Sequence, residues 1–189
     1  MRNAIDAVSM VSTADGGLTE VSNMLQRMRE LALQAANEAT TANGREYSNK
    51  EYENLIAEIQ RIANNTQLKG RAILQGDANA ASGSNVKFQV GANGAQTIAA
   101  NFGNVSQSGG APWSTLHLSA NAGAASFVSA ANTSAALAQG AVALTHIDSA
   151  ITAANLQKAS FGAAVDHCFL MSSIIFLTLK SIPKRPEAG

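Results

Sequence analysis

The side chains that most often carry catalysis or bind metals are few and scattered in this sequence. There are three histidines, and none has the spacing to a second ligand that a metal site needs. They are His117, His146 and His167. The only cysteine, Cys168, permits no internal disulfide and is interpreted as a small buried apolar residue. Phosphate-binding and nucleophile-elbow motifs are also absent, so we expect no enzyme, no cofactor and no metal.

The charge distribution argues against a nucleic-acid partner. Formal net charge is zero, so no long-range field attracts a polyanion. No Asp, Glu, Lys or Arg occurs between Phe88 and Ile147. An uncharged polar tract of this length is typical of a surface that meets copies of itself, or of a mobile polar loop.

The strongest indication of a functional site is a candidate binding surface on the stretch "LQRMRELALQAAN", Leu25–Asn37. Arg27 and Leu31 are i, i+4 neighbours, and with Gln34 they lie away from the apolar stripe, Leu31 bordering the polar face. One interpretation is a solvated face with a stray leucine. The other is an interaction surface, where the arginine makes directed hydrogen bonds and the leucine fills a pocket. The stripe itself is Leu18, Val21, Leu25, Met28, Ala32 and Ala35.

Long helices must position these residues. The 3,4,3,4,3 spacing of the stripe predicts a helix over Asn3–Ala39, loosened at Gly16-Gly17. Asn43-Gly44 indicates a break, and "SNKE" predicts a second helix with Ser48 as N-cap and Glu51 in a capping box. Gly70 is a plausible stop for that helix.

After Gly76 the period changes from helix to strand. Alternation in "SNVKFQVGANGAQTIAANF" predicts a β-hairpin turned at "GANG", with Val86, Phe88 and Val90 on one face. A long polar loop with Trp113 follows, and then a helix over Phe127–Ala164. The fold class is mainly α: an elongated antiparallel bundle of long helices with one β-hairpin. We divide the chain into N-terminal helices (1–76), hairpin and variable loop (77–125), a C-terminal core helix (126–165) and an atypical tail (166–189).

Several segments resemble bacterial flagellin, in the order that this family has them. They are "RNAIDAVSMVSTADGGLTEVSNMLQRMRELALQAAN", "NNTQLKGRAIL", "FQVGANGAQTI" and "IDSAITAANLQKASFGAAV". The resemblance covers roughly residues 2–105 and 125–165. It implies a structural subunit of the extracellular flagellar filament used for motility, with other flagellin subunits, an export chaperone and cap proteins as partners.

The resemblance also implies a second role for the exposed face of the first helix. In the family this face packs against neighbouring subunits, and a vertebrate flagellin-sensing Toll-like receptor of innate immunity binds it. The residues that match the receptor-contacting pattern are Gln26, Arg27, Glu30, Leu31, Gln34 and Glu51.

Two alternatives remain open. A hook–filament junction protein shares the helical core design, although the hairpin motif favours flagellin. A small membrane-associated helical protein would use the apolar run Cys168–Leu179, which is too short to span a bilayer. Because the tail "HCFLMSSIIFLTLKSIPKRPEAG" departs from the family pattern, we expect no stable filament from this chain alone.

Overall fold

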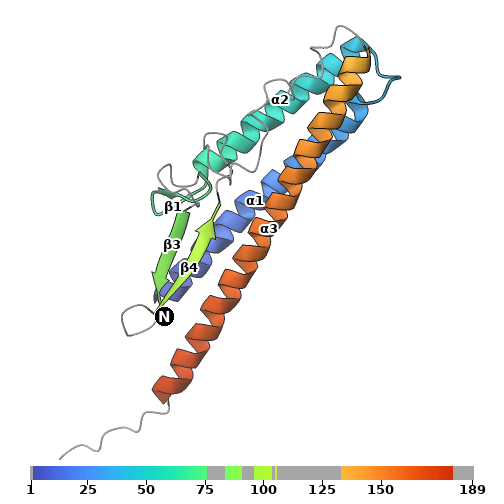
Figure 1. Ribbon diagram of the computed structural model, residues 1–189. Coiled ribbons are helices and arrows are strands. Elements are labelled where there is room, and N and C mark those ends of the chain that lie inside the picture. The colour runs from blue at the N-terminus through green and yellow to red at the C-terminus, as the bar shows by residue number, and fades with distance from the viewer. Residues whose placement is uncertain (1, 76–83, 91–95, 104, 106–132, 181–189) are drawn as a thin grey trace, which may run out of the picture.

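The computed structural model describes residues 2–75, 84–90, 96–103, 105 and 133–180. Three long helices dominate it: α1 (Arg2–Ala35), α2 (Ala42–Asn65) and α3 (Thr133–Lys180). Figure 1 shows α1 running along the body in one direction while α2 and α3 return antiparallel to it. The α1 helix packs against both of the others. The predicted fold class, an elongated mainly α bundle, is confirmed.

The α1 helix is continuous, and its apolar stripe forms the core. Every stripe residue from Leu18 to Ala35 is at most 1% exposed. The expected loosening at Gly16-Gly17 does not occur. A Cβ on Gly17 would lie 2.8 Å from Leu74 Cδ1. The glycine therefore allows the segment after α2 to pack closely against α1, and it does not break the helix.

The predicted start of the second helix is wrong. The helix α2 begins six residues earlier than Ser48, at Ala42, with Thr41 as N-cap, and the Oγ1 of Thr41 accepts from the Gly44 N–H at 3.2 Å. Gly44 lies in the first turn, where backbone N–H groups have no partner within the helix in any case. Ser48 is buried inside the helix and donates to the Gly44 carbonyl, so it does not act as a cap.

A short hairpin that the sequence did not predict follows α2. Strands β1 (Gln67–Leu68) and β2 (Arg71–Ala72) pair antiparallel around Lys69 and Gly70, whose φ angles are +52° and +78°. Gly70 therefore forms a tight turn and does not end the helix.

The predicted larger hairpin is confirmed as β3 (Ser84–Gln89) and β4 (Thr97–Phe102). One face of each strand packs on the helices: Val86 and Phe88 of β3 are partly buried, and Phe102 of β4 is fully buried. The turn between the strands and the loop carrying Trp113 lie outside the described residues.

The α3 helix is longer than predicted. Its expected end near Ala164 is wrong, because the helix continues to Lys180 and takes in the first part of the segment assigned to an atypical tail. Helical hydrogen bonds are local, and no proline occurs between Thr133, where α3 begins, and Pro183. Residues 181–189 lie outside the described part.

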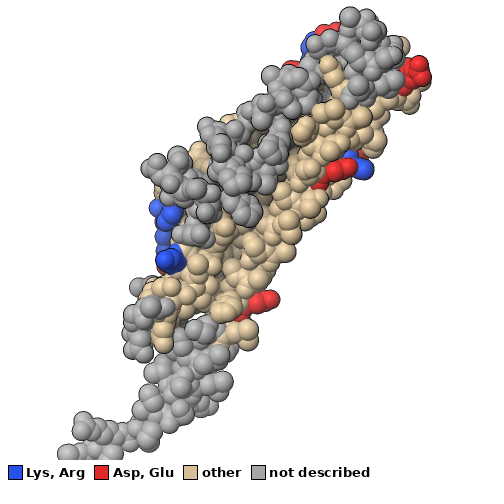
Figure 2. All heavy atoms as spheres, in the orientation of Figure 1, with Lys and Arg blue, Asp and Glu red and all other residues tan. Residues whose placement is uncertain are grey.

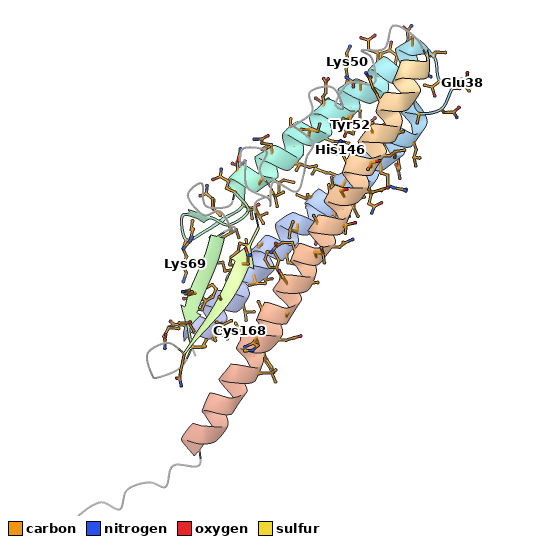
Figure 3. All side chains as sticks on the ribbon, viewed as in Figure 1. Glu38, Lys50, Tyr52, Lys69, His146 and Cys168 are labelled. Carbon is orange, nitrogen blue, oxygen red and sulfur yellow. The ribbon has the colours of Figure 1, made fainter. Side chains whose placement is uncertain are left out.

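Side chains of α3 contact strand β4 of the hairpin and the start of α1 at several points. The rings of Phe161 and Phe102 lie 5.4 Å apart, and Gln157 Nε2 donates to Asn101 O at 2.6 Å. Cys168, labelled in Figure 3, packs with Ala7 and Ile98. The interpretation of Cys168 as a buried apolar residue is confirmed. In the described part of the chain, no helix has both the length and the hydropathy needed to cross a membrane.

Candidate interaction surface

The surface lies where α1 passes the start of α2, and we call it the α1 polar face. Five of the six residues singled out from the sequence have exposed side chains here. They are Gln26, Arg27, Glu30 and Gln34 of α1 and Glu51 of α2. Gln26, Glu30 and Gln34 recur every four positions, and Arg27 lies three positions before Glu30, so all four fall within roughly 100° of the helix circumference. The structure thus places Glu51 of α2 beside the α1 residues, a grouping that in the sequence rested only on the family resemblance.

Arg27 is the centre of the α1 polar face. Its Nε donates to Glu51 Oε1 at 2.8 Å, and its Nη1 donates to Glu30 Oε2 at 2.9 Å. The hydrogen bond with Glu51, followed by that with Glu30, raises the pKa of Arg27 above its ordinary value. All three side chains remain about half exposed or more, so solvent screens these pairs. What the two carboxylates contribute is orientation, because they fix the plane of the guanidinium.

Leu31 does not belong to the exposed surface, and this expectation from the sequence is wrong. Its side chain is 1% exposed and belongs to the main core. The reason is that α1 has two partners on different sides. Arg27 bonds to Glu51 of α2, while Arg29 bonds to Asp148 of α3 at 2.8 Å.

The breadth of the buried arc follows from this arrangement. Arg27 and Arg29 are separated by roughly 200° around the helix, and the core fills the arc between the two neighbouring helices. Leu31, roughly 40° from Arg27, falls within that arc on the α2 side. The sequence analysis identified one apolar stripe, which is what packing against a single partner helix requires, whereas α1 packs against both α2 and α3.

Sequence reasoning also missed Arg45, which caps the end of α1. The Arg45 side chain is 7% exposed, and its Nε and Nη2 donate to the carbonyls of Ala35 and Asn37, each at 3.1 Å. The last carbonyls of a helix have no partner within it, so a cation there both neutralises and hydrogen-bonds them. The sequence feature that could have predicted this cap is a basic residue within ten positions of the end of α1. Arg45 thereby fixes the angle at which α2 leaves α1 and so the position of Glu51.

The arrangement is suited to recognition of another protein. The α1 polar face offers directed donors and acceptors on a rigid helix, next to Leu33, which is 49% exposed. Among the described residues, no three His, Cys, Asp or Glu side chains are grouped as a metal site would require.

Residues 1–79, which include all of the α1 polar face, match the family model of the bacterial flagellin N-terminal helical region. The chain is 42% identical over 98 residues to Flagellin A of Vibrio cholerae, an alignment that spans 52% of this chain and 24% of that protein. It is 39% identical over 97 residues to a flagellin of Halalkalibacterium halodurans, spanning 51% and 34%. The chain thus spans about a quarter to a third of the length of these curated relatives.

The fold is similar to a solved structure over nearly its whole length. The crystal structure of Bacillus cereus flagellin superposes with a TM-score of 0.68 at 28% identity, covering 91% of this chain and 87% of that one.

Proposed function

We propose that the protein is a structural subunit of the extracellular flagellar filament, because residues 1–79 match the family model of the bacterial flagellin N-terminal helical region. The observation that carries the proposal is the α1–α2–α3 bundle, whose fold is similar to that of Bacillus cereus flagellin. The family match of residues 1–79 supports the same role. A repeated subunit needs surfaces that meet copies of itself, and the α3 helix, which is rich in alanine and has few charged residues, suits close packing. This role is structural and not enzymatic. An export chaperone and cap proteins are the further partners that it implies.

Co-assembly tests the filament proposal. The chain, labelled at its N-terminus, is mixed with monomeric Bacillus cereus flagellin while filaments grow from seeds, and the filaments are sedimented and imaged by electron microscopy. We expect the labelled chain in the pellet with the filaments. A chain that stays in the supernatant while the flagellin polymerises contradicts the proposal. The labelled chain alone and a variant unfolded by Leu25→Asp serve as controls.

We further propose that the α1 polar face is a ligand for the vertebrate flagellin-sensing Toll-like receptor. Support comes from Arg27, which Glu30 and Glu51 hold in place on the surface of a rigid helix. An arginine oriented before binding loses less side-chain freedom on binding and is a frequent hot spot. The contacts are assigned to the exposed residues Gln26, Arg27, Glu30, Gln34 and Glu51, and Leu31 supports them from beneath.

Binding of the variants to the isolated receptor ectodomain tests this second proposal. Arg27→Ala is expected to weaken binding about tenfold to a hundredfold, as truncation of an interface arginine does. Lys50→Ala is the matched control, since Lys50 is also an exposed cation on these helices. Circular dichroism confirms that each variant is folded. Parental affinity of a folded Arg27→Ala variant would place the receptor site elsewhere.

A further inference from the structure

A pocket of about 390 Å³ opens between the N-terminal turns of α1, the β1–β2 hairpin and strand β3. Three cations line it, namely Lys69, Arg71 and Lys87, together with one carboxylate, Asp6. Figure 2 shows Lys and Arg atoms gathered on the left margin of the molecule, beside the hairpins, and Figure 3 labels Lys69 there. Three cations less one carboxylate leave a local charge of +2 in a chain whose formal net charge is zero.

The positive charge is only partly neutralised within the molecule. Lys69 Nζ pairs with Asp6 Oδ2 at 2.8 Å. Neither Arg71 nor Lys87 forms an ion pair with any residue that the structure describes, and both side chains are exposed. The apolar residues Met10 and Phe88 also line the pocket. An anionic group on an otherwise apolar chain matches this lining.

One wall of the pocket is a strand edge. The backbone N–H of Val90 donates to Gln96 O at 3.1 Å, which makes these residues a hydrogen-bonded pair in the register of β3 and β4. Bonded and non-bonded pairs alternate along antiparallel strands, so the N–H and C=O groups of Lys87 and Gln89 point away from β4. The contact of Asn3 Nδ2 with Gln89 O at 2.9 Å agrees with this direction.

The edge of β3 and the cations face the same space. Residues Val86 to Gln89 line the pocket consecutively, a length of roughly 13 Å for an extended strand. A lysine on an edge strand often serves only to keep other strands away. Here Arg71 approaches from a separate hairpin, and the Lys69-Gly70 turn with its positive φ angles brings Lys69 to the same side.

We propose that this edge binds an extended acidic peptide segment of another protein by strand addition. The backbone of the segment would bond to Lys87 N–H and C=O, and its carboxylates would pair with Arg71 and Lys87. Asn3 marks one end of the site because it already occupies the Gln89 carbonyl. The site lies apart from the α1 polar face, which begins sixteen residues beyond Met10, and is independent of the receptor proposal.

Fluorescence anisotropy with a labelled peptide of alternating glutamate and valine provides the test. The full chain is expected to bind this peptide, and Arg71→Gln or Lys87→Gln to weaken binding at least about fivefold. Lys50→Gln, which removes an exposed cation from α2, is the matched control and should bind like the parent. The same peptide with N-methylated backbone nitrogens should not bind, because methylation removes the donors that pair with a strand edge. Amide hydrogen exchange at Lys87 should slow when the unmethylated peptide is added.

Three results would overturn the proposal. The first is no binding of the peptide by the folded parent chain. The second is equal weakening by Lys50→Gln, which would indicate unspecific attraction between charges. The third is equal binding of the N-methylated peptide, which would exclude strand addition.

Discussion

Arg27 on α1 and Glu51 on α2 are joined by two contacts of 2.8 Å, from Nε and from Nη2 to the same Oε1 atom. The pair bridges the α1–α2 seam at its solvent edge, one helical turn from the buried Leu31. The sequence predicted that Arg27 and Leu31 lie side by side on the surface. In the structure Arg27 forms a surface ion pair, and Leu31 next to it is part of the core. The distinction changes what each substitution is expected to do.

Leu31→Ala should act on stability and not directly on binding. Truncating a fully buried leucine leaves a cavity and costs about 2–5 kcal/mol of unfolding free energy. Leu33→Ala, at a position 49% exposed, is the matched control and should change stability by no more than about 0.5 kcal/mol. Urea denaturation followed by circular dichroism measures both. Equal stabilities of the two variants would show that Leu31 is not in the core.

Leu25→Asp should disrupt the bundle. Leu25 is completely buried in the main core, and an unpaired carboxylate there costs on the order of 3–5 kcal/mol. Asn23→Asp places the same charge on an exposed position of α1 and should leave the melting temperature nearly unchanged. Differential scanning calorimetry compares the two. If Leu25→Asp melts with the parent, the helix seam is assigned incorrectly.

Tyr52 should make the fold sensitive to alkali. Burial raises the pKa of Tyr52 from 10.0 to about 12, because the phenolate is poorly solvated in the core. Between these two pH values the unfolded chain releases a proton that the folded protein retains, so stability falls as pH rises through that window, by about 2–3 kcal/mol. Denaturation at several pH values should show a shallower decline for Tyr52→Phe. The control Tyr47→Phe, at a position 70% exposed, should follow the parent. Parallel curves for all three proteins would argue against a buried phenol.

Cys168 should be unreactive in the folded protein. Its side chain is 2% exposed, and burial raises the pKa of the thiol, which lowers the fraction of reactive thiolate. We expect slow reaction with a disulfide reagent at pH 8 and a large acceleration in urea. An Ala159→Cys substitution in a Cys168→Ser background provides an exposed thiol on the same helix. Equal rates for the two thiols would show that α3 does not pack on Ala7 and Ile98.

The sequence alone determined the elements whose signals are local. The 3,4 spacing from Leu18 to Ala35 identified the buried stripe of α1, and the alternation at Val86 and Phe88 identified β3. Both patterns repeat with the period of the backbone, so they can be found without knowing any neighbour. The exposure of Arg27 followed in the same way, from its position opposite the stripe.

Only the tertiary structure decided what depends on a second partner. Leu31 is buried because α2 and α3 approach α1 from different sides, and a single helical period does not reveal how many helices surround it. The start of α2 at Ala42 depends on Thr41 as N-cap and on the hydrogen bond from Arg45 to the Ala35 carbonyl of α1. These interactions stabilise a start before Ser48, in spite of the capping-box pattern there. The positive pocket exists because two hairpins and the N-terminal turns of α1 meet, placing Lys69 and Arg71 beside Lys87. Such contacts join residues distant along the chain, and their geometry is set by packing.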